Sequence, residues 1–265
     1  QGELIYGILV WYQFLLIPIR RPGTPMGTPI IEHPQDLPHI PLLYSCLDSP
    51  ITDQDCGEKC APYNEKAVPF CCDTRHAVPT AYLPEWEYLR TSTDLWHVYQ
   101  PDNIADAEAL KAQTPPTQVL IECQGHRFCQ RNYRSITCRA FPFFPYIDPH
   151  RSFIGLTYYW QFEDRCWVIN HLENVTLVFI REFIQTYNKI FQAWPEEIEQ
   201  FLYQSKIMRQ VFGRRKQQIP IFVLSGELKA VSTQTGLFSD LNPREIPKSG
   251  VYKIAEYLRF PDEHD

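Results

Sequence analysis

Seven of the nine cysteines lie in two short stretches of the chain, and this clustering constrains the fold more than any other feature. The first group is Cys56, Cys60, Cys71 and Cys72, and the second is Cys123, Cys129 and Cys138. Soft metal ions and iron–sulfur clusters need several thiolates that converge on one point. The two groups therefore predict a domain of loops and short strands built around a bound metal centre.

The spacing within the first group favours shared ligation. Cys56 and Cys60 are close enough in sequence to reach one ion from a single turn or loop, and the loop that follows lets Cys71 fold back as a third ligand. In an extended backbone the adjacent Cys71 and Cys72 point in different directions. One of them would then ligate while the other packs, reaches a second metal or forms a bridge.

The closing part of the second group resembles a family signature. The segment 128–143 is similar to that of the YkgJ-type cysteine-cluster family, which is described as zinc- or iron-chelating and ends its cysteine series with Cys-Arg-x-Phe-Pro, here Cys138–Pro142. The order of the cysteines is preserved over about residues 45–170. The spacer between Cys60 and Cys71 is longer than in the compact family form, and Ser135 stands where a proline often follows the arginine.

The resemblance also implies a cofactor. A related cysteine cluster in the flagellin lysine methylase family is understood to hold an iron–sulfur cluster, so a 4Fe-4S cluster is the favoured cofactor and zinc is the other. Arg139 is expected to hydrogen-bond a sulfur or balance the thiolate charge, or else to form an ordinary carboxylate pair. His76 and His126 are not needed to fill a four-coordinate site. The candidate metal ligands are Cys56, Cys60, Cys71, Cys72, Cys123, Cys129, Cys138 and Cys166.

Cys46 and Cys166 stand apart from the two groups, and both also fit the description of small buried hydrophobic residues. Zinc and iron–sulfur clusters predict different chemistry for the remaining thiols. Four thiolates close a zinc site and make it structural. A four-iron cluster also takes four cysteines but supports electron transfer, or substrate binding where one iron lacks a protein ligand. Seven or eight thiols would suffice for two zinc ions, or for one cluster with additional packing or redox cysteines.

Two classes of function follow. The first is a metal- or iron–sulfur-binding protein with a redox or group-transfer role. The second is a zinc-stabilised interaction module without catalysis, whose C-terminal helices contact a protein partner. A thiol–disulfide protein using Cys71 and Cys72 is less favoured, because bridged neighbours form a strained ring. Sequence motifs for phosphate-binding loops, dinucleotide-binding turns, zinc-protease helices and hydrolase elbows are missing, so whether the chain is an enzyme stays open.

The expected fold class is α+β, with three parts. Residues 1–40 are proline-rich toward their end and are predicted to form an extended or non-native lead-in. Residues 41–170 form the metal-binding domain, with a short helix within 80–99 and strands at 119–121 and 156–162. Residues 171–265 form a helical hairpin with terminal strands.

The hairpin is predicted from two helical patterns. Apolar residues recur at helical spacing from Leu172 to Phe191, and a second series opens at Pro195 and closes at Gly213. These apolar stripes are expected in the core rather than around a cofactor. A strand is predicted at 219–224, and a strand or short helix at 251–260.

Charge and the N-terminal sequence bear on partners and compartment. A formal net charge of -6 argues against nucleic acid and anionic membranes as main partners. The odd number of cysteines is unlike a secreted disulfide scaffold and favours the reducing cytoplasm. The apolar run Leu4–Ile19 is short for a spanning helix, and Arg20 and Arg21 follow it, unlike a secretory signal; a membrane anchor is the alternative. Because the first methionine is Met26, residues 1–25 are expected to be non-native or derived from a truncated or fused precursor.

Overall fold

The structure is a computed structural model that describes residues 39–101, 103, 108, 110 and 114–253. Nearly all of the predicted lead-in and most of 251–260 lie outside these residues. The described helices are α2 (Ile40–Cys46), α3 (Cys56–Cys60), α4 (Leu83–Ser92), α6 (Ile136–Ala140), α7 (Leu177–Ala193) and α8 (Glu197–Arg215). The strands are β1 (Thr80–Tyr82), β2 (Trp96–Val98), β3 (Gln118–Cys123), β4 (Phe143–Ile147), β5 (Phe153–Tyr158), β6 (Ile219–Phe222), β7 (Leu228–Val231) and β8 (Phe238–Asp240). This mixture confirms the α+β class.

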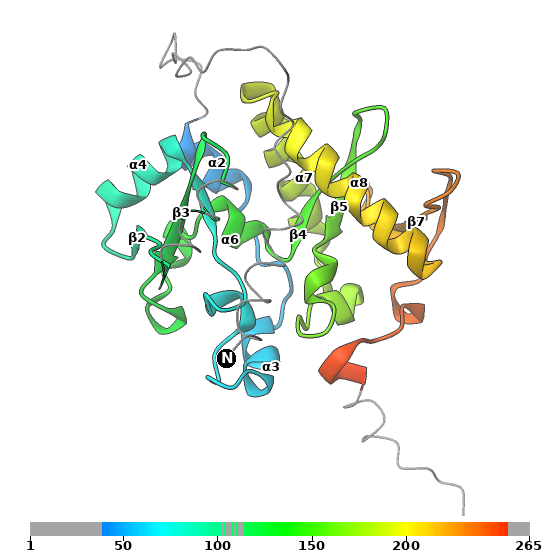
Figure 1. Ribbon diagram of the computed structural model, residues 1–265, viewed down its shortest axis with the longest axis horizontal. Coiled ribbons are helices and arrows are strands. Elements are labelled where there is room, and N and C mark those ends of the chain that lie inside the picture. Colours follow the sequence, from blue (N-terminus) through cyan, green and yellow to red (C-terminus); the bar gives the residue numbers. More distant parts are fainter. Residues whose placement is uncertain (1–38, 102, 104–107, 109, 111–113, 254–265) are drawn as a thin grey trace, which may run out of the picture.

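The strands form two antiparallel sheets. The three-stranded sheet has the order β1-β3-β2, and the five-stranded sheet has the order β4-β5-β6-β7-β8. In Figure 1 the smaller sheet and α4 lie on one side of the molecule, and the larger sheet with α7 and α8 lies on the other. Leu156 of β5 pairs with Phe222 of β6, although α7 and α8 lie between these two strands in the sequence. The boundary predicted at 170/171 therefore falls inside the larger sheet.

The predicted helical hairpin is confirmed in α7 and α8. Thr176 caps α7 by accepting a hydrogen bond from the Phe179 backbone N–H at 3.2 Å. Helix α8 begins at Glu197, shortly after Pro195. It is followed by the C-cap residue Lys216, which adopts a left-handed conformation. Phe201 of α8 packs edge-on against α7, with its ring centroid 5.6 Å from that of Tyr187. Arg214 and Arg215 in the last turn of α8 complement its dipole.

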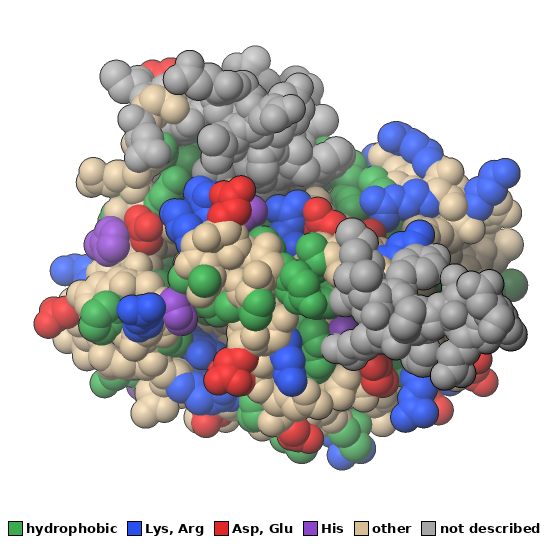
Figure 2. All heavy atoms as spheres, turned by 90° about the horizontal axis from the view of Figure 1, so that it is seen from below, with side chains coloured by type: hydrophobic (Ala, Val, Ile, Leu, Met, Phe, Trp, Pro, Cys, Tyr) green, Lys and Arg blue, Asp and Glu red, His purple; other side chains and the backbone are tan. Residues whose placement is uncertain are grey.

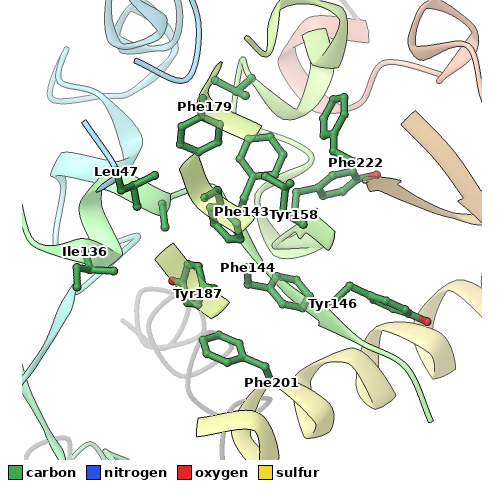
Figure 3. Packing of buried hydrophobic residues seen from close by; sticks show 14 of the residues in the cluster. Leu47, Ile136, Phe143, Phe144, Tyr146, Tyr158, Phe179, Tyr187, Phe201 and Phe222 are labelled. Atoms are coloured by element: carbon green, nitrogen blue, oxygen red, sulfur yellow. The ribbon is translucent and has the colours of Figure 1, made fainter. Parts of the chain in front are cut away.

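The core is aromatic and continuous through both halves of the chain. One cluster of buried residues runs from Ile40 to Tyr252. Figure 3 shows Phe143 and Phe144 of β4 packed among side chains from α7 and β5. Phe144 and Phe179 have 0% exposure, and full burial of such a side chain stabilises by about 1.5–3 kcal/mol. The aromatic stripes of the hairpin are thus core residues, as expected.

Prolines occur within several of the described elements. Helix α2 begins at Ile40, the last residue of the predicted lead-in, and tolerates Pro41 because a missing N–H costs nothing in the first turn. Pro145 lies within β4, for which no strand was predicted. The strand tolerates it because β4 is at the edge of its sheet. The predicted strand at 156–162 gives way to a 3₁₀ helix after Tyr158.

The other predicted elements differ in smaller ways. Strand β3 and helix α4 confirm the strand at 119–121 and the helix within 80–99. Strand β6 confirms the strand at 219–224, and residues 250–253 are helical. A search of the described helices for one with the length and apolar character needed to traverse a membrane found none.

Candidate metal centre

The two cysteine groups meet at one cavity of about 790 Å³. Its walls come from α3, from the 3₁₀ helix Phe70–Cys72, from the end of β3 and from α6. Six thiols line it: Cys56, Cys71, Cys72, Cys123, Cys129 and Cys138. All nine cysteines of the chain are free thiols. The structure therefore brings together residues from both groups, as the clustering predicted.

Local hydrogen bonds fix the first group. The Asp55 carboxylate caps α3 by accepting from the backbone N–H of Gly57 at 2.8 Å and of Glu58 at 3.2 Å. Cys56 and Cys60 stand at the two ends of this helix, four residues apart, so they share one face. The pair at 71 and 72 lies in a 3₁₀ helix, not in the extended backbone that was predicted, and its sulfurs are 4.0 Å apart.

The second group is carried by three different elements. Cys123 ends β3, opposite Trp96 of β2. Cys129 follows the 3₁₀ helix His126–Phe128. Cys138 lies on α6, where the Ser135 hydroxyl caps the helix by accepting from the Cys138 backbone N–H at 3.3 Å. A strand, a turn and a helix thus present one thiol each to the cavity.

Cys60 and Cys166 lie next to the cavity without lining it. Burial raises the pKa of the Cys166 thiol, and the nearby charges of Cys56 and Cys60 raise it further. Burial also raises the pKa of Cys60, on which Cys72 acts as a neighbouring charge. The two residues therefore lie near the thiols of the cavity.

Arg139 pairs with a carboxylate, the second of its two predicted roles, and does not contact a sulfur. Its guanidinium donates to oxygens rather than to a sulfur: the backbone carbonyls of Tyr44, Leu47, Arg131, Asn132 and Arg134, and the Asp48 carboxylate, at 2.9–3.3 Å. It also lies over the ring of Tyr44, 4.4 Å from the centroid. Arg139 is a buried residue that holds the loop after Cys129 in place.

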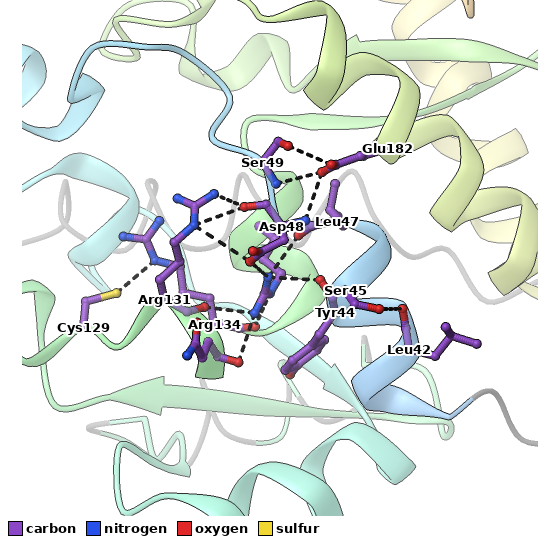
Figure 4. Close-up of polar contacts among 12 residues, drawn as sticks. Leu42, Tyr44, Ser45, Leu47, Asp48, Ser49, Cys129, Arg131, Arg134 and Glu182 are labelled. Carbon is purple, nitrogen blue, oxygen red and sulfur yellow. Dashed lines mark hydrogen bonds and ion pairs between the residues drawn. The ribbon is translucent and has the colours of Figure 1, made fainter.

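The arginine that contacts a thiol is Arg134. Its Nε donates to the Sγ of Cys129 at 3.0 Å, as Figure 4 shows. Burial lowers the pKa of Arg134, but the hydrogen bond to Cys129 and the charges of nearby thiols outweigh burial and give a net rise. Arg139 donates from its Nε to the Arg134 carbonyl at 2.9 Å, so one arginine orients the loop and the other reaches the sulfur. Arg134 was not among the predicted site residues, although it lies in the segment that resembles the family signature.

The same polar network ties the site to the hairpin. Glu182 of α7 accepts from the Ser49 backbone N–H and hydroxyl, both at 2.7 Å, and from the Asp48 backbone N–H at 3.0 Å. Figure 4 shows this carboxylate beside the arginine cluster that surrounds Asp48. The loop next to the site is therefore bonded to the first helix of the hairpin.

Most of the thiols are held in their neutral form when no metal is bound. Burial raises the pKa of Cys138 to about 12 and, with the nearby Cys60 charge, that of Cys56 to about 11. Burial likewise raises the pKa of Cys123. The Cys71 thiol donates to Cys72, which lowers the pKa of Cys72 and raises that of Cys71. A metal that binds here must displace protons, so its affinity increases with pH.

The donor set fits a soft metal, but the thiols are spread around the cavity. Within the described part of the chain, no three His, Cys, Asp or Glu side chains stand close enough together to hold one ion. His126 lines the cavity, whereas the Nδ1 atom of His76 lies 3.0 Å from the Arg165 guanidinium.

The surface around this region carries mixed charge. Helix α3 lies at the bottom of Figure 1, and Figure 2 views the molecule from that side. Basic and acidic side chains are interspersed on the face shown there.

Comparisons of this chain with protein-family models, with curated proteins and with solved structures found no match.

Proposed function

We propose that this protein holds a cysteine-ligated metal centre in the cavity, with an iron–sulfur cluster as the favoured occupant and zinc as the other. The observation that carries the proposal is the gathering of six thiols from two distant cysteine groups at one cavity. Buried free thiols are usually inert and scattered. Metal ligation would explain why six thiols line one cavity. The resemblance to the YkgJ-type family also supports ligation.

The spread of the thiols favours a cluster over a single ion. A tetrahedral zinc site with bonds of about 2.3 Å places its sulfurs about 3.8 Å apart. Cys71 and Cys72 are near that spacing at 4.0 Å, but they are neighbours on one segment. An iron–sulfur cluster binds each thiolate through a different iron, so its ligands stand farther apart. A cavity of about 790 Å³ is large enough for such a group.

A bound cluster would supply electron transfer or a Lewis-acidic iron for group transfer. The residues around the cavity would set the reduction potential of such a cluster. Arg134 donates to Cys129 and offsets thiolate charge, and hydrogen bonds to sulfur raise the reduction potential of such centres. We propose a redox or group-transfer role on these grounds, in a reducing compartment such as the cytoplasm, where the thiols stay free.

The alternative is a zinc-stabilised interaction module that binds a protein through the C-terminal helices. The exposed Leu177 and Val178 at the start of α7, which are 42% and 55% accessible, favour it. However, the apolar faces of α7 and α8 are already buried in the core. The helices thus offer a partner mainly polar surface, and the metal-centred role is preferred.

Metal and acid-labile sulfide analysis of protein purified without oxygen, with an optical spectrum, tests the proposal. Iron with sulfide and a broad brown absorbance is the expected result. Cys129→Ser should reduce the bound iron and the absorbance, whereas Cys46→Ser should retain both, because Cys46 does not line the cavity. Stoichiometric zinc in a colourless protein would favour the interaction module. Folded wild-type protein with neither metal would contradict the proposal.

A further inference from the structure

The thiols of Cys71 and Cys72 are in direct contact. Their sulfur atoms lie 4.0 Å apart, and either thiol can donate to the other. In the part of the chain that the structure describes, which includes all nine cysteines, no other two thiols are joined by a hydrogen bond. The two sulfurs would need to approach each other by only about 2 Å to reach the length of a disulfide bond.

The two thiols differ in exposure. Cys71 is exposed and Cys72 is half-buried, and both line the cavity. An oxidant dissolved in water therefore reaches Cys71 first, and Cys72 stands beside it as a partner thiol. An accessible thiol next to a second, resolving thiol is the usual arrangement of a redox-sensitive cysteine.

The backbone on both sides of the pair is held in place. The Cys72 N–H donates to the Pro69 carbonyl at 2.9 Å, and the side chain of Phe70 is buried. On the other side, the buried carboxylate of Asp73 accepts from the Arg75 guanidinium at 2.7 Å. The fold therefore keeps the two sulfurs near each other before any reaction, which lowers the entropy cost of joining them.

The pair exceeds the number of thiols that a metal centre needs. A zinc ion or a four-iron cluster takes four cysteines, whereas six thiols line the cavity. When the adjacent pair is set aside, four thiols from both cysteine groups remain: Cys56, Cys123, Cys129 and Cys138. The adjacent pair is therefore available for a role of its own.

We propose that Cys71 and Cys72 form a reversible redox site, which hydrogen peroxide oxidises to a disulfide and a small-molecule thiol such as glutathione reduces. In the first step the Cys71 sulfur attacks a peroxide oxygen, the O–O bond breaks, and a sulfenic acid and water are formed. In the second step the Cys72 sulfur attacks the sulfenic sulfur, the S–O bond breaks, and a second water leaves. The two thiols together lose two electrons and two protons, and the peroxide becomes two molecules of water.

Ring strain makes this site reversible. The Cα atoms of neighbouring residues are about 3.8 Å apart across a trans peptide bond, closer than the range of about 4.4–6.8 Å that is usual for a disulfide. A strained disulfide has a high reduction potential, so cellular thiols reduce it readily. Two molecules of glutathione would restore both thiols and leave as glutathione disulfide. The strain that disfavours a permanent bridge here therefore favours a switch.

Oxidation would change the wall of the cavity. The disulfide would withdraw two of the six thiols that line it, including the exposed one. The redox site does not require a bound metal, so its role goes beyond the proposed function.

Peptide mapping of the full chain tests the proposal. Protein purified without oxygen is treated with a small excess of hydrogen peroxide, its remaining thiols are alkylated with iodoacetamide, and it is digested with trypsin. Cleavage after Lys66 and Arg75 releases a peptide whose only cysteines are Cys71 and Cys72. We expect this peptide to escape alkylation and to lose the mass of two hydrogen atoms, and we expect glutathione to restore both thiols.

Two variants and an unfolded sample provide the controls. In Cys72→Ser the reaction should stop at the sulfenic acid of Cys71, which dimedone traps. Cys46→Ser should form the bridge as wild type does, because Cys46 does not line the cavity. In wild-type protein unfolded with urea, the two cysteines should form bridges with several others, since the fold no longer holds them together. The same mixture of bridges from the folded protein would overturn the proposal.

The treatment is carried out on protein as purified and on protein treated with a chelator, and the bound metal is measured in both. The proposal is wrong if folded wild type in both samples yields the peptide with both cysteines alkylated, or with Cys71 oxidised beyond the sulfenic acid. A bridge in protein that binds neither iron nor zinc would support the redox site while the proposed function fails. Bound metal without a bridge in either sample would have the opposite meaning.

Discussion

Glu85 should make the stability of this protein decrease as the pH rises toward 8. Its side chain lies on α4, is 0% exposed, and accepts hydrogen bonds from the Tyr44 hydroxyl at 2.8 Å and the Ile136 backbone N–H at 2.7 Å. Burial raises its pKa to about 7, although these hydrogen bonds and Arg139 act in the opposite direction. The folded state therefore holds a proton that the unfolded chain releases near pH 4.5.

The sign and size of the effect follow from proton linkage. A carboxyl with a raised pKa in the folded state contributes full stability below its unfolded pKa and loses it as the pH rises through its folded pKa. With values of 4.5 unfolded and about 7 folded, the loss between pH 5 and pH 8 is about 2.5 kcal/mol. This is a large share of the stability of an ordinary domain.

Urea unfolding of wild-type protein and Glu85→Gln at pH 5 and pH 8 measures this loss. The glutamine is neutral at both pH values, so the difference in unfolding free energy should shift by about 2.5 kcal/mol in favour of the variant. The unfolding free energies of wild type and variant are subtracted at each pH, which cancels the contributions of metal binding and of Glu197. Burial raises the pKa of Glu197 to about 7 as well. Exposed Glu173 provides the control, Glu173→Gln. An unchanged difference between wild type and Glu85→Gln would refute the reasoning.

Two further perturbations have clear expected outcomes. Arg134→Gln removes the donor to Cys129, so a chelator competition assay should show a metal affinity about 10- to 100-fold lower than that of wild type. An unchanged affinity would show that this hydrogen bond does not contribute to metal binding. Gly155→Ala would place a Cβ 2.1 Å from the Phe222 backbone carbonyl oxygen, and we expect a loss of more than about 3 kcal/mol in thermal unfolding. Gly213→Ala, with its nearest atom at 3.6 Å on a helix, should instead be neutral or stabilising by up to about 1 kcal/mol; similar melting temperatures for the two variants would contradict this account.

The elements predicted best from the sequence are those with long periodic patterns. Helices α7 and α8 have apolar residues at helical spacing and recognisable ends, and both appear close to the predicted positions. Strand β4 has no comparable signal. All five of its residues are buried, so the alternation of a half-buried strand is absent, and Pro145 further obscures it.

Six of the eight predicted ligands line one cavity, and Cys60 and Cys166 do not. Clustering in the sequence indicated which segments would meet, because ligands for one centre must converge. It could not show which arginine would reach a sulfur. Arg139 follows Cys138 on α6, and adjacent residues on a helix point about 100° apart, so Arg139 faces Tyr44 instead. Arg134 lies in the preceding loop, whose path also depends on a contact with a distant part of the chain, where Arg131 donates to the Asp48 carbonyl.

The connection between β5 and β6 bears on the order of folding. The pairing of Leu156 with Phe222 must wait until the chain through α7 and α8 is available, and such distant contacts form slowly. Every candidate thiol precedes β6, so during synthesis all of them leave the ribosome before the larger sheet can close. We therefore expect a nascent protein whose thiols are accessible to cellular metal donors and oxidants for longer than those of the folded chain.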